Sequence, residues 1–257
     1  QETFNLENLS GQKIYKNYEK QKKYLIKCIK SKSFGFIDDL YKKDYSEIIK
    51  LASGLKGFDN ILFLGTGGSS LGGKTLVSVI NNCFYNKTRP NIYFIENVDS
   101  SSIFGLLKNI NLNSTACVVT SKSGETIETI SQFFYVSNIF KKKKISLKKK
   151  FFIITEDKQS SLKEIQEENN FDLIIHPDSI GGRYSVLSIV GLLPASIVNF
   201  NIKNFCDGAK DFLEEIKKSK NFDYFFLPIY KLNRLYKKGI NMSVIMPYSD
   251  SLYNMSF

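Results

Sequence analysis

A glycine-rich turn at residues 65–73 constrains the fold of this chain more than any other stretch. The apolar run 61–64 stops at Gly65, and the helix-compatible segment 75–80 follows the last glycine. This pattern predicts a buried strand, a tight turn and a helix N-terminus. Glycine tolerates positive φ and lets a ligand approach the backbone, and free N–H groups at a helix start attract anions. The stretch therefore predicts an anion-binding turn, with phosphate as the expected anion.

Two familiar nucleotide motifs do not fit this turn. No Gly-Lys-Ser/Thr sequence closes it, as the Walker motif requires. A dinucleotide fingerprint would need glycine at Ser70, and the acid it requires further on is matched only by Glu96 at the end of the next apolar run. From these residues alone, dinucleotide binding stays open, and so does a turn that only lets a helix pack on a sheet.

Two more clusters of small and polar residues follow along the chain. The apolar run 116–120 leads into a second strand-turn-helix unit, and Gly181 begins a third cluster that includes Gly182, Arg183, Tyr184 and Ser185. Hydroxyl groups at a helix start cap free N–H groups and also donate to anions. The second unit carries these polar and small residues: Ser121, Lys122, Ser123, Gly124, Glu125, Thr126 and Thr129.

Short apolar runs alternate with helical segments through the middle of the chain. We expect strands at 61–64, 92–95, 116–120, 151–155 and 173–175, and helices at 71–83, 101–109, 125–140 and 159–168. Continuous apolar strands that alternate with helices indicate an α/β fold, with a parallel sheet covered on both faces. Ligands of such sheets bind beyond the carboxyl ends of the strands, so the turns after the first and third strands are expected to face one crevice.

The three clusters, in this order, resemble the glucose-6-phosphate isomerase family of SIS-domain sugar isomerases. The family's glycine-serine turn matches residues 65–72, its phosphate loop matches 121–129, and its Gly-Gly-Arg-Phe/Tyr-Ser segment matches 181–185. The segment 186–194 fits as well, and the resemblance covers roughly residues 55–257. It implies a three-layer α-β-α SIS domain with a central, flavodoxin-like parallel sheet, preceded by helices and followed by the start of a second SIS domain.

We therefore expect three parts. Residues 1–55 are a segment of two or more amphipathic helices, 56–200 are the first, sugar-phosphate-binding SIS domain, and 201–257 connect to the second domain. An apolar helix is expected at 186–198, and amphipathic helices at 205–218 and 227–237, the latter broken near Pro228. The stretch 241–250 reads as a new buried strand and turn, close to the last residue. A strand left unpaired there would be unusual, so we expect an incomplete chain that is the N-terminal part of a longer protein.

The resemblance implies that backbone and hydroxyl groups bind the phosphate of the substrate. Gly68 and Ser69 contribute from the first turn, and Gly182 from the third cluster. In the second unit, the segment 121–126 clasps the phosphate and Thr129 adds a hydroxyl one turn on. Taken without the family, Ser123 and Thr126 could be plain helix caps, and Lys122 a surface lysine.

Arg183 is the expected catalytic residue. Aldose-ketose isomerisation passes through an enediolate, which needs a base to move the proton and a cation to stabilise the oxyanion. A guanidinium stays charged at any working pH, and the matching family arginine stabilises the enediolate. The alternative for Arg183 is a structural ion pair.

The general base is not evident in this sequence. Glu128 matches a family acid beside the phosphate loop that is not the base, and Glu125 would repel a phosphate unless turned outward. His176 stands before Pro177 at a strand end and is interpreted as structural. In the family, the base is a glutamate on the second domain.

The resemblance implies an enzyme of glycolysis and gluconeogenesis that interconverts glucose 6-phosphate and fructose 6-phosphate without a cofactor, as a homodimer when full length. Two alternatives stay open: a sugar-phosphate-binding SIS module that senses without catalysis, and an isomerase that also accepts mannose 6-phosphate. The missing base favours the sensor.

Composition excludes several other classes. The net charge is +11, but the lysine runs 141–144 and 148–150 are interpreted as solvated surface, without the aromatic-basic interleaving of a nucleic-acid site. Four separated cysteines and one histidine form no metal-binding pattern, so no metal is expected, and they suit a reducing cytoplasm. No apolar run reaches the length of a membrane span.

Overall fold

The computed structural model describes residues 12–42, 44–81, 88–218 and 223–256. The predicted helix end at 82–83, and Cys83 with it, lies outside the described residues. So do residues 1–11 of the predicted N-terminal segment and residues 219–222 of the predicted C-terminal part.

Five parallel strands form one sheet, in the order β2-β1-β3-β4-β5. Each of the five predicted strands is confirmed to within one residue at its start. The central strands β1 and β3 are buried along their whole length, because both faces of the sheet are covered. The strands are β1 (Asn60–Leu64), β2 (Asn91–Ile95), β3 (Thr115–Thr120), β4 (Phe151–Thr155) and β5 (Asp172–Ile175).

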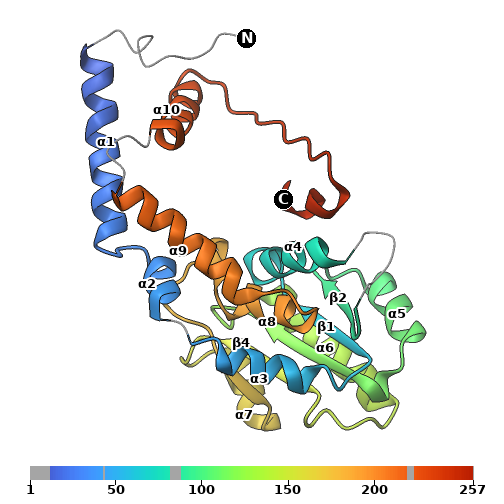
Figure 1. Ribbon diagram of the computed structural model, residues 1–257. Coiled ribbons are helices and arrows are strands. Elements are labelled where there is room, and N and C mark those ends of the chain that lie inside the picture. Colours follow the sequence, from blue (N-terminus) through green and yellow to red (C-terminus); the bar gives the residue numbers. More distant parts are fainter. Residues whose placement is uncertain (1–11, 43, 82–87, 219–222, 257) are drawn as a thin grey trace.

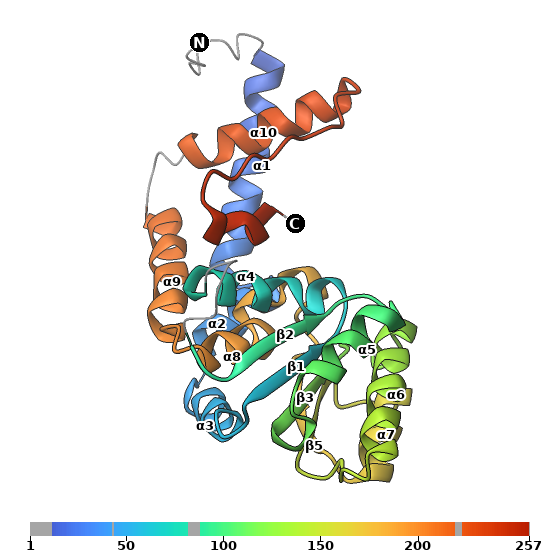
Figure 2. The same cartoon turned by 90° about the vertical axis from the view of Figure 1, so that its right-hand side faces the viewer.

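Helices cover both faces of this sheet and make the predicted three-layer α-β-α architecture (Figure 2). Alternate residues of β1 point to opposite faces: Ile61 packs into the core under α3, α4 and α8, and Leu62 into the core under α5, α6 and α7. The first set is α3 (Ser46–Leu55), α4 (Leu71–Ile80) and α8 (Ile189–Ile197). The second set is α5 (Ser100–Asn109), α6 (Ile127–Lys142) and α7 (Ser161–Asn169).

The helix that follows β3 begins two residues later than predicted. Gly124 has a φ of +73° and Thr126 is extended, so the backbone is not helical until Ile127. Similarly, the predicted helix 186–198 begins at Ile189, because residues Gly182–Leu187 form the 3₁₀ helix η4 and Ser188 caps α8. Both polar clusters are therefore loops or short turns that precede a helix.

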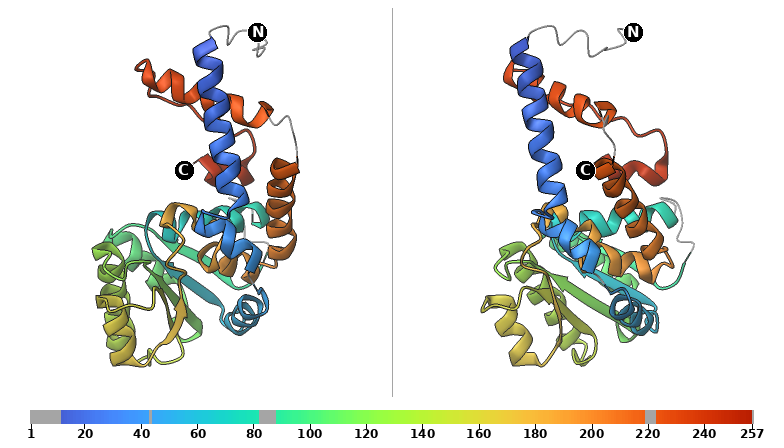
Figure 3. Two further views of the ribbon diagram at one scale, coloured as in Figure 1. Left: turned by 90° about the vertical axis from the view of Figure 1, so that its left-hand side faces the viewer. Right: turned by 60° about the vertical axis from the view of Figure 1, so that its left-hand side comes forward.

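The predicted amphipathic helices at the N-terminus are present. They are α1 (Gln12–Lys30), α2 (Gly35–Lys42) and α3. A separate apolar cluster, which includes Tyr18, Ile216 and Tyr230, joins α1 to α9 (Ile202–Lys218) and α10 (Asp223–Lys237). Figures 1 and 3 show that α1 and α10 project beyond the sheet. The predicted break at Pro228 is wrong: α10 is continuous with Pro228 inside it. The burial of Phe226, Leu227 and Tyr230 offsets the helix hydrogen bond that the proline removes.

The predicted buried strand at 241–250 is also wrong. Residues 241–249 are irregular, and Val244 and Tyr248 are 85% and 97% exposed (Figure 1). No strand of the described chain lies alongside to complete a ladder, so the segment cannot form one. The 3₁₀ helix η5 (Asp250–Ser256) then returns to α4, where the Thr75 hydroxyl donates to the Asn254 carbonyl at 2.8 Å.

No helix in the described part of the chain has the length and apolar character needed to cross a membrane.

Candidate functional site

The two predicted phosphate turns lie side by side at the carboxyl edge of the sheet. β1 and β3 are neighbours, with Leu64 in register with Val119, so Gly65 and Ser121 emerge next to each other. In the order β2-β1-β3-β4-β5, the chain runs from β1 to β2 on one side and from β3 to β4 on the other, so the two connections diverge between β1 and β3. A ligand crevice is expected at such a topological switch point.

The first turn packs directly against the third cluster. A β-carbon added at Gly68 would lie only 2.1 Å from the carbonyl oxygen of Gly182, so no side chain fits there. The Ser185 hydroxyl donates to the Gly68 carbonyl at 2.6 Å. Ser69 ends the short 3₁₀ helix η2 (Gly67–Ser69), within the same turn. The structure thus brings together Gly68, Ser69, Gly182 and Arg183.

The second turn is closed by its own hydroxyl groups. The Ser121 hydroxyl donates to Thr126 Oγ1 at 2.9 Å and accepts from the Gly124 N–H at 3.2 Å. Ser123 Oγ accepts from the Glu125 N–H at 3.2 Å. Gly124 is buried against Ser160, whose Oγ would be 2.1 Å from an added β-carbon. Positive φ and this close approach explain why glycine stands at position 124.

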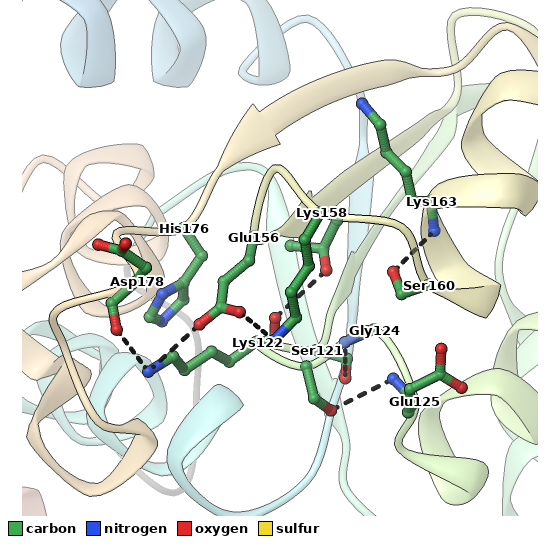
Figure 4. Close-up of polar contacts among 12 residues, drawn as sticks. Ser121, Lys122, Gly124, Glu125, Glu156, Lys158, Ser160, Lys163, His176 and Asp178 are labelled. Atoms are coloured by element: carbon green, nitrogen blue, oxygen red, sulfur yellow. Dashed lines mark hydrogen bonds and ion pairs between the residues drawn. The ribbon is translucent and has the colours of Figure 1, made fainter.

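Lys122 reaches from the second turn towards the third cluster (Figure 4). Its Nζ donates to the Asp178 carbonyl at 2.8 Å and forms an ion pair with Glu156 at 3.3 Å. Asp178 lies in the loop that leads from β5 to Arg183. Lys122 therefore connects the second turn to the segment that leads to Arg183, and it is not a free surface lysine.

Glu156 was missed by the sequence interpretation. It follows β4 at the same edge of the sheet, is only 7% exposed, and pairs with both Lys122 and Lys158. The hydrogen bond from Lys158, together with that from Lys122, outweighs burial and lowers the pKa of Glu156. Its position directly after a buried strand was a usable signal, because the other two turns start in the same way.

Glu125 is turned away from the loop that it follows. Its carboxylate accepts from the backbone N–H of Ser161 at 2.7 Å and from the Ser161 hydroxyl at 2.8 Å, which caps the start of α7. The backbone hydrogen bond is the largest cause of the lowered pKa of Glu125. The structure therefore meets the condition under which an acid is tolerated beside a phosphate.

Two other residues lie away from the surface of the site. Thr129 is fully buried in α6, and its Oγ1 has no hydrogen-bond partner among the described residues. His176 is buried too, with Nδ1 2.8 Å from the Pro177 carbonyl oxygen, and burial lowers its pKa. The environment of His176 agrees with its interpretation as a structural residue.

Arg183 is exposed at the start of η4. Its guanidinium forms no ion pair with any residue that the structure describes. The structural ion pair that was its alternative role is thus not seen, and the charge is free to meet a ligand.

The carboxylate of Glu96, directly after β2, is already bound by side chains at the end of the first turn. It accepts from Ser70 Oγ at 2.8 Å and pairs with Lys74 Nζ at 2.5 Å. A carboxylate held in this way is not presented to a ribose, so the arrangement argues against dinucleotide binding. Among the described residues, no three His, Cys, Asp or Glu side chains are grouped to hold a metal ion.

The strand order, the two polar turns at its switch point and the covering helices define a three-layer α/β protein with a candidate anion-binding crevice. The sequence profile of the family described as "Phosphoglucose isomerase" matches residues 38–257. The chain belongs to this phosphoglucose isomerase family.

Two curated relatives are similar over about half of their own length. A probable glucose-6-phosphate isomerase of Methanococcus maripaludis is 36% identical over 92% of this chain and 55% of the relative. A glucose-6-phosphate isomerase of Carboxydothermus hydrogenoformans is 33% identical over 87% of this chain and 50% of the relative.

Solved structures agree on the fold. A hypothetical protein from Thermus thermophilus superposes with a TM-score of 0.76, at 21% identity, over 93% of this chain and 58% of that one. A glucose-6-phosphate isomerase from Chlamydia trachomatis superposes with a TM-score of 0.67, at 24% identity, over 81% of this chain and 40% of that one.

Proposed function

We propose that this chain forms the phosphate-binding half of a glucose-6-phosphate isomerase, which interconverts glucose 6-phosphate and fructose 6-phosphate through an enediolate. The observation that carries the proposal is the convergence of three sequence-distant clusters at one switch point. Gly68 contacts the Gly182–Arg183 backbone, and Lys122 bridges the second cluster to the loop before Arg183. Family membership supplies the reaction.

The second turn, residues 121–126, is the proposed binding site for the phosphate of the substrate. Ser123 is exposed and Thr126 is half-buried, and the turn is pre-closed by the hydrogen bond between Ser121 and Thr126. A loop that is already ordered loses little conformational entropy when the anion binds. Binding energy from this distant phosphate orients the reacting carbons for proton transfer.

Arg183 is the proposed partner of the reacting end of the sugar. It extends from the segment that packs on the first turn, and it has no competing carboxylate among the described residues. A positive charge fixed before the reaction stabilises the enediolate oxyanion without reorganisation. The proposal requires Arg183 to act on the intermediate more than on the substrate.

The proton-transferring base is placed outside the part of the relatives that this chain matches. Glu96 is engaged by Ser70 and Lys74, Glu125 caps α7, and Glu156 is paired with two lysines. Each of these three carboxylates therefore already has a structural partner and is not free to collect a proton from the substrate. The exposed Glu128 matches a family acid beside the phosphate loop that is not the base. We also propose a homodimer in the cytoplasm for the whole enzyme.

The test uses a sugar acid as a mimic of the enediolate. A five-carbon aldonate 5-phosphate carries a carboxylate where the enediolate charge develops, and it should bind this chain at least about tenfold more tightly than fructose 6-phosphate in calorimetry. A coupled dehydrogenase assay on the same sample should show no turnover, because the base is absent. Equal affinity for the two compounds would favour a sensor over an isomerase.

A further inference from the structure

A cavity of about 540 Å³ lies between α1 and α10, on the part of the molecule that projects beyond the sheet. Four cationic side chains line it: Lys16 and Lys20 from α1, and Arg234 and Lys237 from α10. The remaining lining residues are carboxamides and Tyr230, and no acidic residue is among them.

Apolar packing and one ion pair hold the two helices together. The rings of Tyr18 and Tyr230 meet edge to face with centroids 5.3 Å apart, and Lys22 pairs with Asp223 at 2.7 Å. These contacts align an i, i+4 pair of lysines on one helix with an i, i+3 pair of cations on the other. The cluster of charge is therefore fixed by the packing of the helices.

The acids of these helices are all used elsewhere. Glu19 is the only acid in α1 and Asp223 the only acid in α10, and both pair with Lys22, at 4.0 and 2.7 Å. None of the four cations around the cavity forms an ion pair with any part of the chain that the structure describes. Like charges gathered at one place repel each other, and a bound anion removes that cost.

We propose that this cavity binds a small oligophosphate, an anion with two or more linked phosphate groups. Four cations match the charge of such a ligand better than that of a single phosphate dianion. Arg234 offers the planar fork that binds phosphate oxygens in pairs, and the lysines add point charges. The carboxamides supply further N–H donors.

The size of the cavity and its lining favour a small molecule over a nucleic acid. Small-molecule sites commonly enclose about 300–1,000 Å³, and this one falls within that range. Single-stranded nucleic acids also stack their bases on exposed aromatic faces, whereas Tyr230, the aromatic residue that lines the cavity, is buried against Tyr18.

The experiment is a calorimetric titration of the chain with inorganic tripolyphosphate at fixed ionic strength and saturating fructose 6-phosphate. The double variant Lys16→Gln/Lys20→Gln should weaken binding at least tenfold, and Arg234→Gln/Lys237→Gln should do the same. Lys23→Gln/Lys27→Gln is the matched control, because it removes the same charge at the same spacing from exposed sites on α1. It should change the affinity less than twofold. Thermal melting checks that each variant is folded.

Several results would overturn the proposal. An equal loss of tripolyphosphate affinity in all three variants would show that the binding depends only on the net charge of the protein. Orthophosphate that binds as tightly as tripolyphosphate would exclude an oligophosphate site. Displacement of tripolyphosphate by fructose 6-phosphate would place it in the candidate active site, and an oligonucleotide that binds more tightly through the same residues would make the surface a nucleic-acid site.

Discussion

At the scale of single residues, Arg183 and Glu156 show what the sequence can and cannot predict. Arg183 was singled out as a candidate by its place in a short motif, which needs no knowledge of the fold. Glu156 was missed because its partner Lys122 is 34 positions away in the numbering, and the pair exists only once β3 and β4 lie side by side. Long-range pairing of this kind is not written in local patterns.

Arg183→Gln should weaken the binding of the aldonate phosphate by at least about tenfold and that of fructose 6-phosphate by less than about threefold, because Arg183 is proposed to meet the charge of the intermediate. Calorimetry with both ligands gives the comparison. Arg89→Gln is the control, since it removes the same charge from an exposed site before β2, at the opposite edge of the sheet. An equal loss for both ligands would make Arg183 a substrate-binding residue only.

Glu156→Gln should lower the free energy of unfolding by about 1 kcal/mol at pH 7, because it removes the negative charge that pairs with Lys122 and Lys158. The pKa of Glu156 is lowered below its ordinary value of 4.5 in the folded protein, so the unfolded chain binds the proton more readily. Its contribution is therefore present above pH 4.5 and is lost as the pH falls through the folded pKa.

Urea unfolding of both proteins at pH 7 and at stepwise lower pH checks this expectation. The difference between wild type and Glu156→Gln should shrink as the pH falls below 4.5. Glu128→Gln is the control, since Glu128 is exposed. A difference that stays constant over this range would show that Glu156 does not stabilise the fold through its charge.

At the scale of elements, strands were predicted better than the segments that depend on distant partners. Each predicted strand was a short apolar run, a signal contained within a few residues, and β1 and β3 are buried on both faces. The stretch 241–250 has a similar apolar run, yet it is exposed, because a strand also needs a neighbour that no local pattern supplies. The start of α6 was misplaced for another reason: Gly124 turns the backbone before the helix begins.

Gly68→Ala should separate the first turn from the third cluster, because its β-carbon would meet the Gly182 carbonyl oxygen at 2.1 Å. We expect the affinity for fructose 6-phosphate to fall by at least about tenfold, since a displacement near 1 Å is enough to misplace binding groups. Calorimetry on folded protein is the measurement. Gly105→Ala is the matched control, because nothing lies within 4 Å of its β-carbon. Unchanged binding by Gly68→Ala would show that the two clusters act independently.

At the scale of the whole molecule, the chain contains the five-stranded sheet with its covering helices and, beside it, a second and smaller apolar cluster. The helices α1, α9 and α10 share one apolar cluster although they come from opposite ends of the sequence. The division into parts at residues 55 and 200 stays a prediction. The chain spans about half the length of the curated relatives described above. In the function proposed above, this chain binds the phosphate and a part of the enzyme outside it transfers the proton.

That assignment leads to one direct measurement on this chain: calorimetric titration with fructose 6-phosphate and, separately, with fructose. Fructose 6-phosphate should bind, and fructose should show no measurable binding. Lys122→Ala should weaken the binding of fructose 6-phosphate. Binding of both sugars with equal affinity, or of neither by folded protein, would contradict a phosphate site built from the three clusters.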